Sequence, residues 1–256
     1  MNDKRKRAVI FGKDAHRYDR ARPSYPAPLV DDLVALGGHE VLDVGCGTGK
    51  AGRLLAASGF DVLGVEPDRR MADVARAHGL AVEESTFEAW DPAGRGFDLV
   101  VSGQAWHWVD PLVGPAKAGD VLDGRGWLAL FWNGPEYDQD VRRRLDEVYE
   151  QVVPQMAPGS KQAKEAKGDG TAGHVAAIES SGRFASVEVQ SYGWSWVGTA
   201  AEYCDKLATH SDHILLPREQ REMLLRRVGE VIAPAGGRLA IDYTTTLILA
   251  GRGGAS

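Results

Sequence analysis

The sequence predicts an α/β protein in which a mainly parallel sheet is covered by helices on both faces. Short apolar runs alternate with helical segments through the first half of the chain, an order that favours parallel strands joined by crossover helices. The first run, Glu40–Val44, breaks into three alternate glycines and is followed by a helical stretch from Lys50. A strand that turns through glycines into a helix is typical of sites for nucleotide-like ligands.

The elements expected before residue 133 alternate in order. The strands are Glu40–Val44, Asp61–Glu66, Leu80–Glu84, Phe97–Ser102 and Trp127–Trp132, and the helices are Pro28–Leu36, Lys50–Ser58, Asp68–His78 and Asp110–Leu122. Gly37 follows the first helix and Pro67 precedes the third, the positions where glycine ends and proline begins a helix. The segment 11–28 is rich in aromatic residues and prolines, which favour a bent, extended chain. A turn is expected at 124–126.

The pattern changes after Asn133. The expected elements are a charged helix Tyr137–Val153, a loop 154–172, a helix His174–Ser181, a strand Phe184–Ser195, helices Thr199–His210 and Pro217–Ile232, and a strand Leu239–Ala250. We therefore divide the chain into a ligand-binding core with an N-terminal lid segment (1–133), an inserted cap or lid (134–180), and C-terminal strands and helices that complete the sheet (181–256).

Composition narrows the class of protein. The chain has 256 residues, 43% apolar and 26% charged, with a net charge of −6, which fits one domain with insertions or a domain with a cap and does not favour nucleic acid as a partner. The two cysteines fall in a glycine loop and a helix, so no disulfide is expected. The sequence shows neither a membrane-spanning run nor a signal peptide. We expect a cytoplasmic monomer or homodimer with no membrane partner.

An acid inside the first strand decides between two kinds of cofactor. Asp43 lies two residues before Gly45, and its carboxylate suits a ligand with an amine and a sulfonium better than a pyrophosphate. The segment from Gly47 to Gly52 matches the dinucleotide pattern G-x-G-x-x-G. The glycine directly after the strand is Gly45, however, which leaves Lys50 where the third glycine belongs. A nicotinamide-dependent reductase is therefore the less favoured alternative.

A second acid, Glu66, ends the second strand 23 residues after Asp43. A carboxylate at this place accepts hydrogen bonds from the hydroxyls of an adenosine ribose. The alternative is an acid that interacts with the dipole of the following helix.

Four segments carry a resemblance to a known family: Val41–Gly49, Glu66, Phe97–Val101 and Ser102–Trp108. They resemble class I S-adenosylmethionine-dependent methyltransferases, and more narrowly the type 11 group that includes trans-aconitate methyltransferase-like proteins. The segments 22–26 and 205–252 are similar to that group too, and 154–172 is the least similar stretch. The resemblance implies a Rossmann-like, seven-stranded sheet with a reversed final hairpin and a small helical cap, S-adenosylmethionine as cofactor, and a small-molecule acceptor.

The resemblance also implies roles for individual residues. The implied cofactor residues are Asp43, Gly45 and Gly47 at the methionine part, Glu66 at the ribose, Thr86 and Phe87 at the adenine, and Ser102 to Gln104 beside the sulfonium and the substrate. The topology agrees, because ligands in open α/β sheets bind at the carboxyl ends of the strands.

The N-terminal segment supplies further candidates. The resemblance suggests that it folds over the cofactor, where the planar fork of Arg22 would hold a carboxylate of the cofactor or of a substrate. Tyr18 would lie near the sulfonium, and Tyr25 would contact the substrate. The alternative is an ordinary packed surface segment.

Aromatic residues are expected on the acceptor side. Trp106 and Trp132 are candidates for substrate binding, with Trp108 facing the core, or Trp106 and Trp108 in the reverse arrangement. His107 and Gln104 are the candidate catalytic residues, His107 as a general base or as a structural hydrogen-bonding residue. Methyl transfer is an in-line displacement that needs no base if the nucleophile is already ionised, and alignment supplies much of the rate.

Two further groups of residues are considered as parts of a site. Trp194 and Trp196 share one face of a strand and either line the pocket or pack under helices. His210, Asp212 and His213 have too few neighbours for a metal site, so we expect no metal and a solvated helix end. The main alternative function is an S-adenosylmethionine-binding regulator or partner subunit without catalysis.

Overall fold

The computed structural model describes residues 11–158, 160, 170–233 and 236–253. Its seven strands form one sheet in the order β3-β2-β1-β4-β5-β7-β6. They are β1 Glu40–Val44, β2 Asp61–Val65, β3 Ala81–Glu83, β4 Phe97–Gly103, β5 Leu122–Glu136, β6 Ser186–Thr199 and β7 Arg238–Gly251. The first five are parallel, whereas β7 runs antiparallel to both β5 and β6. The predicted Rossmann-like, seven-stranded, mostly parallel sheet is confirmed, and in the expected reversed final hairpin of β6 and β7 only β7 is reversed.

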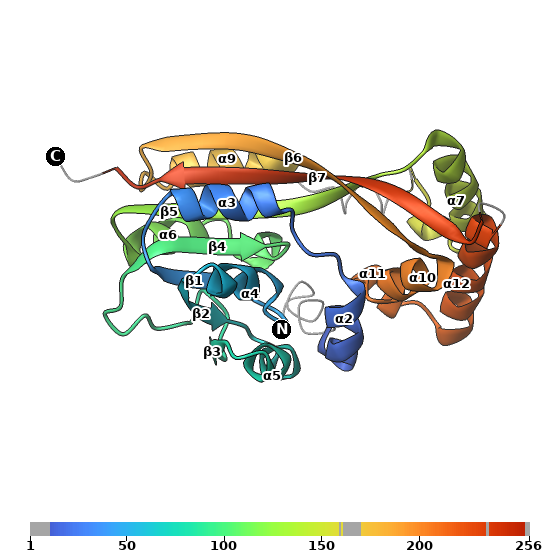
Figure 1. Ribbon diagram of the computed structural model, residues 1–256, viewed down its shortest axis with the longest axis horizontal. Helices are drawn as coiled ribbons and strands as arrows, with labels where there is room; N and C mark the ends of the chain where they lie inside the picture. Colours follow the sequence, from blue (N-terminus) through green and yellow to red (C-terminus); the bar gives the residue numbers. More distant parts are fainter. Residues whose placement is uncertain (1–10, 159, 161–169, 234–235, 254–256) are drawn as a thin grey trace.

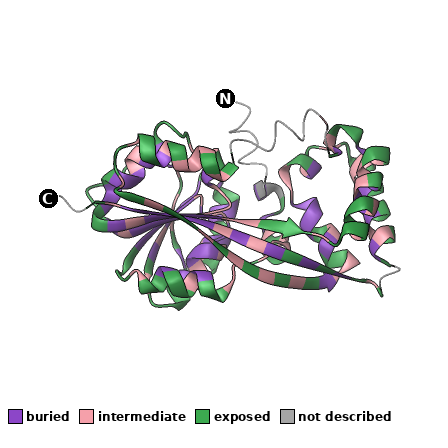
Figure 2. Ribbon diagram, turned by 90° about the horizontal axis from the view of Figure 1, so that it is seen from above, coloured by how far each residue is buried: buried purple, intermediate pink, exposed green. Residues whose placement is uncertain are grey.

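Helices cover both faces of the sheet, as Figure 2 shows from above. On one face pack α3 Ala27–Ala35, α4 Lys50–Ala57 and α5 Arg69–Ala77, whose apolar residues form a cluster with β1, β4 and β5. On the other pack α6 Gly114–Val121 and α9 Gly170–Ser180, together with aromatic side chains of the segment after β3. Two apolar layers therefore enclose the parallel strands.

The last three strands are much longer than the others and continue past the parallel part of the sheet (Figure 1). Their far ends carry the helices α7 Gln139–Val152, α10 Ala200–Ala208, α11 Ser211–Ile214 and α12 Arg218–Ile232. A separate cluster centred on Leu145, Leu224, Val228 and Ile241 joins α7, α10 and α12 to β7. We call this helical end of the molecule, 137–158, 194–233 and 236–243, the cap. It draws on both the expected cap region and the C-terminal region.

The N-terminal segment differs from its expected extended form. Residues Phe11–Asp14 form a 3₁₀ turn, η1, and Ala15–Ala21 form α2. Asp14 caps α2 by accepting a hydrogen bond from the Arg17 amide, and the apolar face of α2 packs on Met71 of α5. The prolines restrict only the chain after α2, so the prediction of a bent, extended segment is wrong for 11–21.

Several boundaries differ from the sequence expectations. The expected turn at 124–126 lies inside β5, where its pairing with β4 shifts register between Phe97 and Leu99. Helix α6 begins at Gly114 because Pro115 fits its first turn. Within the expected loop, Pro154–Met156 form a 3₁₀ turn, η3, and α9 begins at Gly170, while 159 and 161–169 fall outside the described residues.

Two other expectations concern cysteines and membranes. Both cysteines are free, as expected. Among the described residues, no helix combines the length and the apolar character needed to cross a membrane.

Candidate functional site

The turn after β1 is built from glycines with left-handed backbone. Gly45, Gly47 and Gly49 have φ of +67°, +57° and +82°. A side chain at Gly45 would place its Cβ 2.6 Å from the Cβ of Ala105, which is closer than carbon atoms can approach. Glycine is therefore required both by the backbone angle and by the space, and the loop presents bare backbone at the carboxyl end of β1.

Asp43 lies beneath this turn with one unsatisfied oxygen. The carboxyl group is buried, Oδ2 accepts a hydrogen bond from the Gly52 amide at 3.0 Å, and Oδ1 has no partner among the described residues. Burial raises the pKa of Asp43 from 3.8 to about 7, although the Gly52 hydrogen bond opposes this. A buried acceptor without a partner requires an explanation, and the ammonium group of an amino-acid tail would satisfy it.

Glu66 ties the end of β2 to the glycine turn. Its Oε2 accepts from the Gly47 amide and its Oε1 from the Asp68 amide, both at 2.9 Å. Burial raises the pKa of Glu66 to about 7, against these hydrogen bonds. A carboxylate accepts up to about four hydrogen bonds, so ribose hydroxyls can join the two amides. The bond to Asp68, which caps α5, also fits the helix-terminus alternative.

The carboxyl end of β4 carries two candidates. The buried Ser102 hydroxyl donates to the Val44 carbonyl at 2.8 Å, so this side chain joins β4 to β1 instead of facing a ligand. Gln104 has a φ of +60°, rare for a residue with a side chain. The backbone amide of Gln104 donates to the Phe131 carbonyl at 2.9 Å. Its side-chain Nε2 lies 3.5 Å from the Asn133 carbonyl. Strained backbone at a strand end is a feature of ligand sites.

Two aromatic candidates belong to the apolar core. Trp106 is only 2% exposed and packs with Phe87, their ring centroids 5.8 Å apart. Phe87 is also buried and stacks near Trp90. The expectation that Trp106 contacts the acceptor is therefore wrong for this conformation, because the 3₁₀ turn at 106–108 turns this ring inward. Thr86, next in the chain to Phe87, is half-buried.

The other aromatic candidates remain nearer the surface. His107 is exposed and its ring packs on Trp108 with centroids 4.6 Å apart. Trp132 stacks on His174 of α9 at 4.8 Å with nearly parallel rings. The contact between His107 and Trp108 does not assign a proton-transfer role to His107.

The N-terminal candidates lie across the junction between core and cap. Tyr25 packs edge-on against Phe131, and its hydroxyl lies against Gly103 at the end of β4. Arg22 lies 5.0 Å from the Tyr18 ring, and its Nη2 donates to the carbonyl of Thr209 at the end of α10, 3.1 Å away. The segment therefore connects the core to a cap helix.

A hydrogen-bonded chain that the sequence did not reveal runs from this edge toward the cap. Asn133 of β5 donates to the Ser24 carbonyl at 3.0 Å and accepts from the Thr245 hydroxyl at 2.6 Å. Trp194 donates to Thr245 at 2.8 Å and stacks on Tyr243. Trp196 packs in the same cap cluster, so both tryptophans line the underside of the cap. The chain depends on the register of β5, β7 and β6, which no local pattern encodes.

The expected solvated helix end at 210–213 is wrong for His213, whereas Asp212 is exposed. His213 is buried, with Nδ1 2.7 Å from Asp212 and Nε2 2.6 Å from the Tyr149 hydroxyl. Donor atoms of His210, Asp212 and His213 lie within 4.8 Å of one another. Both ring nitrogens of His213 already have partners, and the hydrogen bond to Tyr149 joins α11 to α7.

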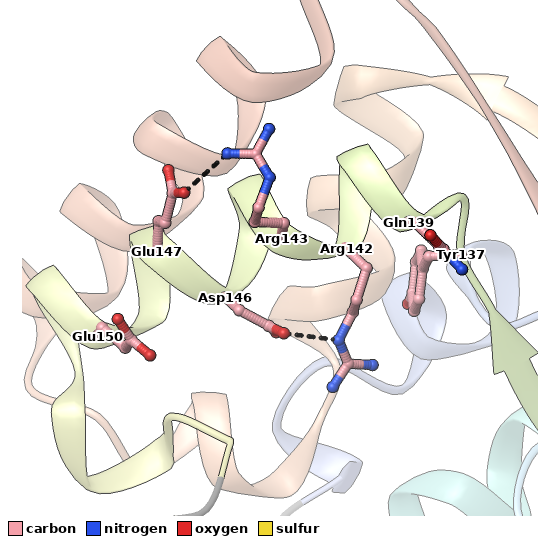
Figure 3. Close-up of a pocket in the computed structure, with 7 residues that line it drawn as sticks. All are labelled: Tyr137, Gln139, Arg142, Arg143, Asp146, Glu147 and Glu150. Carbon is pink, nitrogen blue, oxygen red and sulfur yellow. Dashed lines mark hydrogen bonds and ion pairs between the residues drawn. The ribbon is translucent and has the colours of Figure 1, made fainter.

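A surface pocket of about 480 Å³ lies on the cap (Figure 3). It is lined by Tyr137, Gln139, Arg142, Arg143, Asp146, Glu147 and Glu150. Arg142 pairs with Asp146 at 2.9 Å, and Arg143 pairs with Glu147 at 3.0 Å. These pairs lie along one exposed face of the charged helix expected over Tyr137–Val153, and the pocket contains none of the predicted site residues.

The glycine turn, Asp43 and Glu66 at the switch point of a parallel sheet define a nucleoside-cofactor-binding α/β protein. The model of the "Methyltransferase domain" family matches residues 41–117. An uncharacterized methyltransferase of Mycobacterium tuberculosis is 31% identical over 96% of this chain and 97% of its own. A ubiquinone biosynthesis O-methyltransferase of Cereibacter sphaeroides is 37% identical, over only 36% of this chain and 40% of its own.

The fold matches solved structures as well. The structure of a putative type II methyltransferase from Anaeromyxobacter dehalogenans superposes with a TM-score of 0.68 at 20% identity, covering 90% of this chain and 97% of the other. The chain belongs to the class I S-adenosylmethionine-dependent methyltransferases. It is an enzyme with S-adenosylmethionine as methyl donor, and the nicotinamide-dependent alternative has no support in these similarities.

Proposed function

We propose that this methyltransferase transfers the methyl group to an oxygen of a small-molecule acceptor held between the carboxyl edge of the core sheet and the cap. The observation that carries the cofactor part of the proposal is the buried Asp43 carboxylate, with an unpartnered oxygen beneath a bare-backbone turn. The preference for oxygen is supported by the similarity of the core to an O-methyltransferase. The narrower likeness to the type 11 group is supported by the segment 22–26.

The chain's own residues would orient the reactants. Asp43 would accept hydrogen bonds from the cofactor ammonium, and Glu66 would accept them from the ribose hydroxyls, while Gly45 and Gly47 allow close backbone approach. The cofactor supplies an electrophilic methyl group on a sulfonium. Since such a displacement depends on alignment, the task left to the protein is to fix both reactants and to exclude water.

The acceptor side would be formed by residues at the ends of β4 and β5. Gln104 would border the transferred methyl group, because its strained backbone fixes it at the end of β4. Tyr25 and Trp132 would contact the acceptor, and Tyr18 of α2 would cover the cofactor. His107, exposed on its 3₁₀ turn, would serve as the base only for an acceptor that is protonated at working pH.

Calorimetry with S-adenosylhomocysteine tests the cofactor site directly. We expect the wild-type protein to bind with a Kd on the order of micromolar, and Asp43→Ala to weaken binding about 100-fold, because a charge-assisted hydrogen bond to a buried carboxylate is worth about 3 kcal/mol. Asp61→Ala, at the exposed start of β2, is the matched control and should bind like wild type. No binding by the wild-type protein would overturn the proposal.

Turnover separates an enzyme from a cofactor-binding subunit. We expect methyl transfer from labelled S-adenosylmethionine to members of a panel of hydroxylated small molecules. Tight cofactor binding without transfer to any oxygen, nitrogen or carbon acceptor would favour the regulator instead.

A further inference from the structure

The cap contains a buried lysine without an acidic partner. Lys206 of α10 is 5% exposed, and its Nζ donates to the Tyr243 hydroxyl. The ammonium lies 5.0 Å from the ring centre of Tyr203 and 5.2 Å from that of Tyr243. Within the described residues no carboxylate forms an ion pair with it. Because lysine is rarely buried unless it is paired with an anion, a negatively charged ligand group is a candidate partner for Lys206.

A second cation lies next to it. Arg22 donates from Nη2 to the Thr209 carbonyl at 3.1 Å. The amide and hydroxyl of Thr209 both donate to the carbonyl of Lys206, at 3.1 and 2.6 Å, so Arg22 is attached to the helix turn that bears the lysine. The Nε of Arg22 is buried without a partner, and this guanidinium also forms no ion pair with a described residue.

The surroundings add polar groups and one carboxylate, Asp212, which lies near His210 and is hydrogen-bonded to His213. Burial and the Arg22 cation lower the pKa of Lys206 from 10.5 to about 8. His210, next to Thr209, has a buried Nε2 without a partner among the described residues. Burial, Arg22 and His213 hold the pKa of His210 well below its ordinary value, so it stays neutral. Lys206, Arg22 and His210 therefore bring three nitrogen-bearing side chains to the C-terminal end of α10.

Another partly buried arginine shows the usual arrangement. Arg53 of α4 pairs with Asp19 of α2 at 2.6 Å, and both side chains are largely shielded from water. Two adjacent cations without an anion are instead unfavourable, because burial removes hydration and their charges repel. Such a pair lowers the stability of the unliganded folded protein, and a bound anion would raise that stability by neutralising the charges.

The cation pair is at the junction of core and cap. Arg22 lies in the segment that leads to Tyr25, whose hydroxyl contacts Gly103 at the end of β4. Lys206 contacts Tyr243, and Trp194 stacks on that tyrosine with ring centres 4.6 Å apart. The cations therefore adjoin both the strand end where methyl transfer is proposed and an aromatic surface of the long strands.

We propose that Lys206 and Arg22 bind a carboxylate or phosphate group of the methyl acceptor, with Trp194 and Tyr243 beside an unsaturated or aromatic part. The inference rests on the proposed function and names its substrate class. The competing anion is the carboxylate of the cofactor itself. The acceptor is favoured because Lys206 and its aromatic neighbours belong to the cap and the long strands, whereas the glycine turn and Asp43 belong to the core, and because Arg22 is bonded to the cap helix.

Titration of a saturated S-adenosylhomocysteine complex with matched probes tests this. The probes are benzoate, phenyl phosphate and the neutral benzamide, measured by calorimetry. We expect at least one of the two anions to bind at least about tenfold more tightly than benzamide, because hydrogen bonds to charged groups are worth about 1.5–3 kcal/mol. The tighter of the two anions distinguishes a carboxylate from a phosphate site.

Variants assign the binding to the pair. Lys206→Met should weaken anion binding at least about tenfold, Lys206→Arg should retain part of it, and Arg22→Gln should weaken it similarly. Arg143→Met, which removes an exposed cation from the same cap, is the control and should bind like wild type. The affinity of the two Lys206 variants and of Arg143→Met for S-adenosylhomocysteine should match that of the wild-type protein.

Three results would overturn the inference. The first is equal binding of benzamide and both anions by the wild-type protein. The second is anion binding that is unchanged in Lys206→Met and Arg22→Gln. The third is loss of S-adenosylhomocysteine affinity in Lys206→Met, which would assign the lysine to the cofactor. The comparison of benzamide with the two anions uses only the wild-type protein, so it tests the inference even if a substitution impairs folding. Failure of the wild-type protein to bind S-adenosylhomocysteine would instead refute the cofactor site.

Discussion

The two sides of the site carry opposite charges that the protein itself leaves unpaired. At the core edge, Asp43 and Glu66 are buried carboxyl groups that no cation contacts among the described residues, and their pKa values are raised to about 7. At the cap edge, Lys206 of α10 and Arg22 of the N-terminal segment are cations that form no ion pair with a carboxylate of the described residues. The comparison indicates that each side is completed by a ligand of the opposite charge, the cofactor ammonium at the core and an acceptor anion at the cap.

The two sides are also built differently. The core edge uses backbone, since glycines with positive φ expose the chain and amides hold Glu66 in place. The cap edge uses side chains from strands and helices far apart in the sequence, joined by the cluster around Leu224. A site built from backbone suits the cofactor, which is the same in every methyl transfer. A site built from side chains can be altered by substitution to suit a different acceptor.

The largest expected effect comes from Asp43→Asn. Because burial raises the pKa of Asp43 from 3.8 to about 7, the folded state holds more protons than the unfolded chain between about pH 4 and 7. Stability of the unliganded protein therefore falls as pH rises through that window. At about 1.4 kcal/mol per pKa unit, ionised Asp43 costs on the order of 4 kcal/mol at pH 8.

Denaturation at pH 5 and pH 8 measures this cost. Asp43→Asn should be more stable than the unliganded wild type at pH 8, should lose less stability between the two pH values, and should bind S-adenosylhomocysteine about 100-fold more weakly. Asp61→Asn, at an exposed position, should behave like wild type. A variant that is less stable than wild type at pH 8 would show that the carboxylate is satisfied within the protein.

A smaller effect is expected from Leu224→Ala, which opens a cavity in the cap. Leu224 is fully buried, so the substitution should cost about 3 kcal/mol of stability. If core and cap act as separate layers, the Kd for S-adenosylhomocysteine should stay within about twofold of wild type, while methyl transfer falls. Leu42→Ala, equally buried in β1, should lower both stability and cofactor affinity. Equal loss of cofactor affinity in the two variants would contradict the separation.

The smallest effect concerns the contact between the two sides. Arg17 of α2 forms an ion pair with Asp205 of α10 at 2.5 Å, and both side chains are substantially exposed. A double-mutant cycle with Arg17→Met and Asp205→Asn should give a coupling below about 1 kcal/mol that disappears at high salt. A larger, salt-independent coupling would mean that the lid segment and the cap move as one body.

Local patterns determined the core of this protein. The strand, the alternate glycines, Asp43 and the spacing to Glu66 are read from neighbouring residues, because backbone angle and strand period are local properties. They were sufficient to predict the alternating α/β core and the two acids at its strand ends, whereas the seven-stranded sheet and S-adenosylmethionine were implied by the resemblance to a family. They did not decide which side of a strand end a residue faces, so Ser102 and Trp106 were expected at the ligand and are buried in the sheet and core.

Only the tertiary structure decided the cap side of the site. Arg22 meets the end of α10 across 187 positions of the chain. Lys206 lies on the buried face of that helix, and no sequence pattern singled it out as a site residue. Whether a cation has a counter-ion depends on which segments meet in space, and the long antiparallel strands that bring these together carry no local signal of their register. The charge left unpaired there is therefore a property of the fold alone.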